Sequence, residues 1–329
     1  MPGHGTAPRP HSLRTRASTG NEVRVAEGGV GQWQLSRPTV SEFGLLTIAV
    51  LGVSMSAPLT ALAAAPALGI AFWRNAVGAA LLVPGATAQL RRQPLSRRQL
   101  ALCLLSGGFL AAHFAAWLPS VTLTTVAAST ALVCTTPIWT TLAARIAGHR
   151  VPGQVWIGLA LGLLGVVLVT GVDVTVSTRA LTGDLLALLG GILAAGYVLL
   201  GASIREQVST AAYAAVCYST AAVLLAAAAL ATGAPLGGYA ARDWLLILGI
   251  TVCAQMLGHT ILNRVVSTVG PTVVGLAILL EVPGAALLAF VLIGQVPALL
   301  VVPGLVLIVG GIAVVIRSGG DRVQTGPST

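Results

Sequence analysis

This sequence of 329 residues has no lysine and few charged side chains of either sign. Charged residues make up 8% of it and hydrophobic residues 56%, whereas about a quarter of the residues in a soluble globular domain are charged. The composition therefore excludes a water-soluble enzyme or binding domain. Because a membrane-spanning helix needs about 20 apolar residues, we expect an all-α polytopic membrane protein.

Positive charge comes from arginine alone, and the arginines lie between apolar runs rather than in one basic patch. That distribution argues against nucleic acid as a partner. The four cysteines all fall within apolar runs, at no metal-ligand or disulfide spacing. We therefore expect no metal and no other cofactor. A small-molecule substrate and the lipid bilayer are the expected partners, and a homodimer is left open.

The chain also lacks an early apolar segment, so no secretory signal is expected. Residues 1–40 are rich in Pro, Gly, Ser and Thr and are predicted to form a disordered cytoplasmic tail. Ten apolar runs follow and predict ten transmembrane helices. The runs cover residues 41–60, 66–86, 99–119, 122–146, 152–172, 184–203, 210–232, 243–263, 270–293 and 298–316.

The arginines orient these helices. If the N-terminus is cytoplasmic, every arginine between the runs except Arg179 and Arg242 faces the cytoplasm, whereas Arg74 lies inside the second run. By the positive-inside rule, both termini, including the tail 317–329, are predicted on the cytoplasmic side of the cell (inner) membrane.

Two stretches of the chain match without a gap. A shift of 146 positions lays His113–Gly148 over His259–Gly294 and pairs Pro137 with Pro283. Chance matching of Ala, Leu and Val is the alternative, but it does not account for matched His, Pro and Gly in one frame. The match predicts two five-helix repeats, 41–172 and 184–316. Because five is odd, the second repeat enters the bilayer inverted, as in several classes of secondary transporter.

Glycines in the fifth and tenth runs predict close helix packing, either within one chain or in a homodimer. They are Gly158, Gly162, Gly165, Gly304, Gly310 and Gly311.

Glu281 is the one carboxylate placed deep inside an apolar run. A charge at that depth costs about 2.5–3.5 kcal/mol on insertion scales, so Glu281 is expected to face the bundle interior or a wet cavity. It could take part in proton coupling, or it could be a structural acid hydrogen-bonded to neighbouring helices. Both interpretations stay open at this stage.

Pro137 and Pro283 interrupt helical hydrogen bonding at equivalent places. The carbonyl groups that they free could line a cavity, although simple helix kinks are the commoner outcome. Thr135 and Thr136 occupy the positions of Glu281 and Val282 in the first repeat. The two halves therefore share a backbone break and differ in charge.

Other polar side chains within the runs are candidates for substrate binding. His259 and Asn263 share a helix face, as do His113 and Trp117; a histidine satisfied at a helix–helix contact is the alternative. Tyr197 is the amphipathic side chain of the sixth run. One more candidate follows from charge and position: Arg74 either attracts an anionic group or, as we expect, snorkels to the interface beside Trp73.

The ten-run, twice-five layout resembles the drug/metabolite transporter superfamily, specifically its EamA-like branch. The stretch ILLEVPGAALLAFVLIGQ is similar to the family's Glu-Pro-Val-type signature followed by a helix and Gly-Glu, although Gln295 replaces the acid after Gly294. The segments FWRN around Arg74, HFAAW from His113 and GHTILN from Gly258 are also similar. The resemblance covers about residues 41–316 and implies a carrier that exports or exchanges small metabolites, often amino acids or drug-like compounds.

We therefore expect a secondary transporter rather than an enzyme, with the first, third, fourth, sixth, eighth and ninth runs lining a central cavity. A flippase for a lipid or lipid-linked precursor is the alternative, because the same fold could serve it. An intramembrane enzyme is a distant one, since neither GxSxG nor HExxH occurs.

Overall fold

The computed structural model describes residues 38–170, 177–296 and 301–320, all of which belong to one unit, Trp33–Thr329. The predicted tail up to residue 37, residues 171–176 at the junction of the repeats, residues 297–300 and the last nine residues lie outside the described part. Within that part every regular element is a helix. Five of the predicted runs supply the first group of helices: α1 (Val40–Ser54), α2 (Ser56–Leu62), α3 (Ala67–Arg92), α4 (Arg97–Leu123), α5 (Val126–Val133), α6 (Thr136–Ile146) and α7 (Gly153–Thr170).

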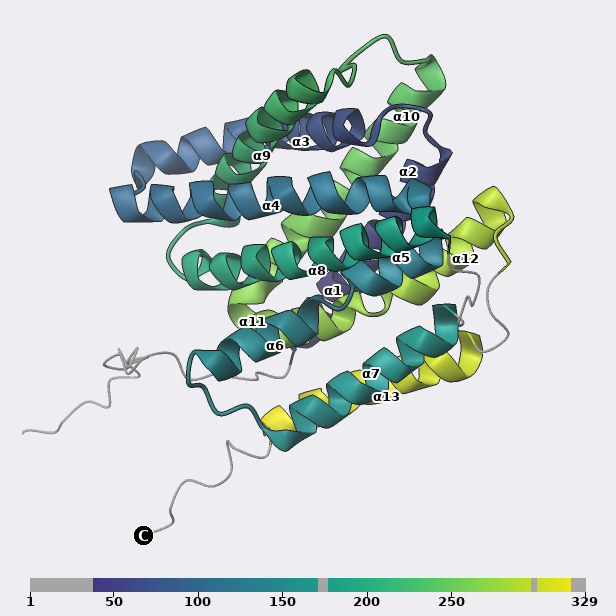
Figure 1. Cartoon of the computed structure of the whole chain (residues 1–329). Coiled ribbons are helices and arrows are strands. Elements are labelled where there is room, and N and C mark those ends of the chain that lie inside the picture. Colours follow the sequence, from purple (N-terminus) through teal and green to yellow (C-terminus); the bar gives the residue numbers. More distant parts are fainter. Residues whose placement is uncertain (1–37, 171–176, 297–300, 321–329) are drawn as a thin grey trace, which may run out of the picture. The chain divides into compact units, whose positions relative to one another are not determined.

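The second group of helices follows α7 in the chain (Figure 1). It consists of α8 (Thr178–Arg205), α9 (Thr210–Thr232), α10 (Ala241–Ile250), the π-helix η1 (Thr251–Thr260), α11 (Ile261–Ile278), α12 (Glu281–Ile293) and α13 (Val301–Gly320).

Among the described residues, seven helices are long and apolar enough to cross a membrane, and three shorter apolar helices accompany them. The shorter ones cover Gly153–Leu168, Glu281–Ile293 and Val302–Arg317. The all-helical membrane class is thus confirmed, while the count of ten spanning helices stays a prediction. Continuous helix from Ala241 to Ile278 joins the predicted eighth run to the start of the ninth.

That long helix is interrupted at Gly270, which has φ 83° and ψ 159°. A residue with a side chain rarely adopts this backbone conformation, so the position favours glycine. Pro271 follows and lacks the backbone N–H that a continuous helix would need. The two residues together separate the eighth run from the ninth, close to where the sequence placed the boundary.

Polar caps start several of the helices. Thr39 and Ser96 each form a capping box, with Glu42 and Gln99 respectively, and Ser177 and Ser209 accept from the third residue of α8 and α9. A cap satisfies N–H groups that have no partner in the first turn. These caps explain where the four helices begin, which is at the start of the predicted apolar run or up to six residues before it.

The core is made by pairs of helices from different halves. Helix α4 packs on α8, α3 on α9, and α7 on α13. In the last pair, a Cβ atom on Gly158 would lie 2.7 Å from the Gly311 carbonyl oxygen, so only glycine allows this approach. Close packing is therefore confirmed for this pair, whereas Gly310 has open space in front of it. Gly158 and Gly311 thus pack within one chain, and the alternative of a homodimer stays open.

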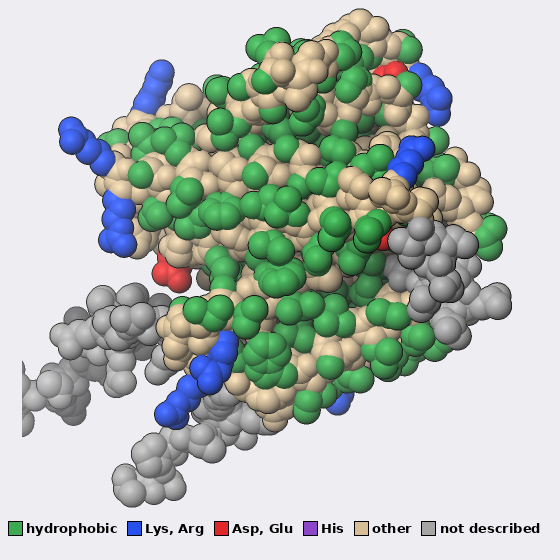
Figure 2. Space-filling model, in the orientation of Figure 1, with side chains coloured by type: hydrophobic (Ala, Val, Ile, Leu, Met, Phe, Trp, Pro, Cys, Tyr) green, Lys and Arg blue, Asp and Glu red, His purple; other side chains and the backbone are tan. Residues whose placement is uncertain are grey.

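Large hydrophobic side chains lie exposed on the outside of the bundle, among them Leu81, Leu185 and Val306. Figure 2 shows hydrophobic side chains over the middle of one face and arginines gathered toward its ends. A soluble monomer rarely exposes so wide an apolar surface. The surface is that of a multi-pass membrane protein, with lipid around its middle.

Candidate functional site

A cavity lies between the helices of the two halves. The empty space between its lining atoms is about 740 Å³ when the open space at its mouth is counted with it. Its walls come from the first, third, fourth, sixth, eighth and ninth predicted runs, the same six that were expected to line it. The lining residues are Val53, Ser56, His113, Trp117, Val133, Cys134, Thr136, Ala194, Tyr197, Val198, His259, Leu262, Asn263, Val266, Val274, Ile278 and Glu281.

Seven of the candidate residues lie in this wall: His113, Trp117, Thr136, Tyr197, His259, Asn263 and Glu281. The other four, Arg74, Thr135, Pro137 and Pro283, do not line it. The structure thus brings together residues up to 168 positions apart in the chain, from His113 to Glu281.

The acidic end of the cavity is built on two helix breaks. Helix α5 ends at Val133 and α6 begins at Thr136, while α11 ends at Ile278 and α12 begins at Glu281. Cys134, in the first break, has its Sγ 3.8 Å from Glu281 Oε2 and 3.6 Å from the Ile278 carbonyl oxygen. Glu281 lies in the first turn of α12, where the positive end of the helix dipole stabilises a carboxylate.

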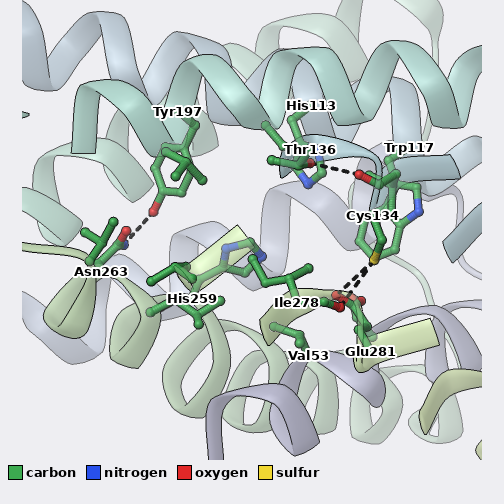
Figure 3. Close-up of a pocket in the computed structure, with 17 residues that line it drawn as sticks. Val53, His113, Trp117, Cys134, Thr136, Tyr197, His259, Asn263, Ile278 and Glu281 are labelled. Atoms are coloured by element: carbon green, nitrogen blue, oxygen red, sulfur yellow. Dashed lines mark hydrogen bonds between the residues drawn. The ribbon is translucent and has the colours of Figure 1, made fainter. Parts of the chain in front are cut away.

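The opposite end of the cavity carries an amide and a phenol. Asn263 Nδ2 donates a hydrogen bond to the Tyr197 hydroxyl oxygen. The amide oxygen of Asn263 is left as a possible acceptor for a ligand. Figure 3 shows this pair at one end of the cavity and Cys134 with Glu281 at the other.

Two histidines lie between these ends, with ring centroids 6.4 Å apart. The His113 ring stacks on Trp117 at 5.5 Å, and the His259 ring meets the Phe114 ring edge-on at 5.5 Å. His113 Nδ1 is 2.9 Å from the Gly190 carbonyl oxygen on α8, so Nδ1 must carry the proton and Nε2 is an acceptor. His113 therefore both ties α4 to α8 and lines the cavity.

Arg74 does not snorkel, and that expectation is wrong. Its side chain is 0% exposed, with Nε 2.8 Å from Gln255 Oε1 and Nη1 2.9 Å from Ser56 Oγ. Its guanidinium carbon also lies 4.2 Å from the centre of the Phe114 ring. Two hydrogen-bond acceptors and the face of the Phe114 ring stabilise the guanidinium inside the bundle, so the side chain does not extend to the membrane interface. Arg74 thus lies directly behind the cavity wall.

Sequence reasoning missed Ser56 and Gln255. Each is a single uncharged polar residue in an apolar run, and Gln255 is separated from Arg74 by 181 positions. A buried guanidinium needs hydrogen-bond acceptors, so Arg74 itself was the signal that polar residues on other helices should be sought.

The π-helix η1, which carries Gln255 and His259, was also not foreseen. A π-helix has a wider turn than an α-helix and often occurs at functional sites. Here it places Gln255 toward Arg74 and His259 in the cavity wall. No residue type in the sequence signals it.

Pro137 and Pro283 lie at the helix breaks and do not line the cavity. Pro137 has no N–H for the Val133 carbonyl, and the Thr136 hydroxyl donates to that oxygen at 2.8 Å instead. Thr135 is likewise occupied, since it donates to the Leu132 carbonyl at 2.7 Å and accepts from Trp139 Nε1 at 3.1 Å. Gln295 accepts from the backbone N–H of Val126 at 3.3 Å and so helps to start α5.

The described residues contain no group of three or more His, Cys, Asp or Glu that could hold a metal ion. The chemistry of the cavity is therefore that of hydrogen bonds, one carboxylate and aromatic faces. Such a site can bind and orient a small molecule.

Comparison with known proteins agrees with this geometry. A solved structure, described only as the crystal structure of a protein, has 19% sequence identity and a TM-score of 0.70, over 88% of this chain and 100% of that one; it shares the fold. No curated protein matches. The profile of the EamA-like transporter family matches residues 41–171 and 181–317, one match for each repeat. The chain belongs to the EamA-like transporter family, within the drug/metabolite transporter superfamily.

Proposed function

We propose that this protein is a secondary transporter that moves a small metabolite, an amino acid or a drug-like compound, across the cell membrane by alternating access. Efflux or exchange is the proposed direction, and both termini are proposed to be cytoplasmic. The observation that carries the proposal is the cavity between the two repeats, which combines an apolar wall with a carboxylate, two histidines and an amide. This mixture suits a small amphipathic ligand better than a lipid tail.

The helix breaks support the alternating-access part of the proposal. They fall at Cys134–Thr135 and at Leu279–Leu280, next to the acidic end of the cavity. A broken helix can tilt one segment against the other without losing the hydrogen bonds within each segment. The two breaks would let the cavity open first to one side of the membrane and then to the other.

The energy source is proposed to be an ion or substrate gradient. A nucleotide-binding P-loop needs a lysine that reaches the phosphates, and the sequence has none. Glu281, which faces the cavity, is the proposed coupling group, because a carboxylate can hold either a proton or a ligand cation.

The test is uptake by the purified protein in proteoliposomes. Radiolabelled amino acids and organic cations are supplied with and without a proton gradient. We expect saturable accumulation of one class of compound that a gradient increases. The absence of uptake of every compound, with labelled lipid crossing the bilayer instead, would overturn the proposal in favour of a flippase.

A further inference from the structure

A buried polar cluster lies behind the cavity wall and has no part in the transport step described above. At its centre is Arg74, bound to Gln255 of η1 and to Ser56 of α2. Gln255 Nε2 in turn is 3.2 Å from Asn75 Oδ1. Arg74, Asn75 and Gln255 are each 0% exposed, and Ser56 is 2% exposed. The cluster therefore sits in the interior of the bundle.

The guanidinium of Arg74 is incompletely paired. Its Nη2 has no hydrogen-bond partner among the described residues, and the groups that bind Nε and Nη1 are uncharged. A buried charge of this kind is costly unless a group of opposite charge compensates it. Glu281 attracts the guanidinium electrostatically, but no ion pair joins these two described side chains. A negative group brought close to Arg74 would therefore be attracted strongly.

Ser56 is the one member of this cluster that also lines the cavity. Its Oγ accepts the hydrogen bond from Arg74 Nη1, so its own proton must point away from the guanidinium. No described residue accepts that proton. A hydroxyl that accepts from a cation becomes a stronger donor, and the cavity is where an acceptor could lie.

We propose that Ser56 is a specificity-determining residue that presents the positive charge of Arg74 to an anionic oxygen of the ligand, such as a carboxylate. Glu281, in the wall of the same cavity, takes the ligand's ammonium group. The cavity then favours a zwitterion over a simple amine, and its branched apolar wall, including Val53, Val274 and Ile278, accommodates an aliphatic side chain. This inference rests on the proposed transport function.

The experiment compares three compounds that share one side chain: leucine, leucinamide and 3-methylbutylamine. Each is supplied to proteoliposomes that contain the wild-type protein, Ser56→Ala or Ser56→Thr. Wild-type protein should transport leucine better than the other two. Loss of a charge-assisted hydrogen bond should lower leucine transport by Ser56→Ala about 10-fold and lower 3-methylbutylamine transport much less. Ser56→Thr, which keeps the hydroxyl, should restore the preference for leucine.

Ser54→Ala is the matched control. Ser54 is buried two positions away, donates to the Val50 carbonyl at 2.8 Å and does not line the cavity, so this change should leave the ratio of leucine to amine transport as in the wild type. Retained amine transport by Ser56→Ala also shows that the variant folds. Equal loss of all three compounds in Ser56→Ala, or a wild-type protein that prefers the amine, would overturn the role of Ser56. Only a wild-type protein that moves none of the three, and nothing in the wider panel, would contradict the transport function itself.

Discussion

One broken helix in each half of the protein has a similar backbone break and a different chemistry at that break. In the first half, α5 and α6 meet at Cys134–Thr135, and in the second, α11 and α12 meet at Leu279–Leu280. A proline follows each break at the equivalent position. The Thr135 hydroxyl is hydrogen-bonded to the Leu132 carbonyl and to Trp139 Nε1, whereas Glu281 lines the cavity. The shared elements thus set the architecture, and the residue that differs supplies the charge.

The strongest test of this difference removes the charge. Glu281→Gln keeps the size and the helix start of α12, but it loses the carboxylate. A hydrogen bond to a charged group contributes about 1.5–3 kcal/mol, so transport should fall at least about 10-fold. Uptake rates at equal reconstitution levels measure the effect. Unchanged uptake in Glu281→Gln would show that the asymmetry has no functional meaning.

A second change tests whether a carboxylate at the break in the first repeat can replace Glu281 in transport. The double variant Glu281→Thr with Thr135→Glu moves the carboxylate to the equivalent place in the first repeat. Because Thr135 does not line the cavity, we expect the double variant to transport no better than Glu281→Thr alone. Monodisperse elution of both proteins from a size-exclusion column is the control for folding, and recovery of transport would mean that the two breaks are interchangeable.

The two histidines offer a third, smaller comparison. His113 holds the Gly190 carbonyl of α8, so His113→Ala should lower both transport and stability, the latter by about 1 kcal/mol. The structure gives His259 no hydrogen bond within the described residues, so His259→Ala should reduce transport with little change in melting temperature. Thermal unfolding in detergent, measured beside uptake, separates the two effects; equal melting shifts would contradict the distinction.

The smallest effects are expected from the prolines. Pro137→Ala and Pro283→Ala restore a backbone N–H but remove no group that faces the cavity. Each should reduce transport less than either histidine change, and the two should behave alike, because both act only on the helix break. A loss in Pro283→Ala alone, as large as in Glu281→Gln, would mean that the second break has a role that the first one lacks.

Much of this organisation could be predicted from the sequence. Long apolar runs and caps such as Ser96 determine where helices lie, and the matched His, Pro and Gly residues revealed the repeat. Glu281, as a carboxylate in an apolar run, had to face inward, and the structure places it in a cavity wall. These features depend on neighbouring residues in the sequence, or on the match between a segment and its copy in the other repeat.

The partners of Arg74 could not be predicted in the same way. Burial of a guanidinium depends on which distant helices offer acceptors, and Gln255 and Ser56 come from two different ones. The π-helix that positions Gln255 could not be predicted either. Its turn is wider than that of an α-helix, but no residue type in the sequence marks the difference. The snorkelling expectation failed because it considered Arg74 with its sequence neighbours only.

The central claim, that the transported compound occupies the cavity beside Glu281, is tested most directly by chemical protection. A hydrophobic carbodiimide is added to the reconstituted protein, and modification of Glu281 is followed by mass spectrometry, with Glu281→Gln as the blank and Glu206, near the end of α8, as an internal reference. A transported compound at saturating concentration should slow the modification of Glu281 and leave that of Glu206 unchanged. An unchanged rate at Glu281, at concentrations that saturate transport, would contradict the claim.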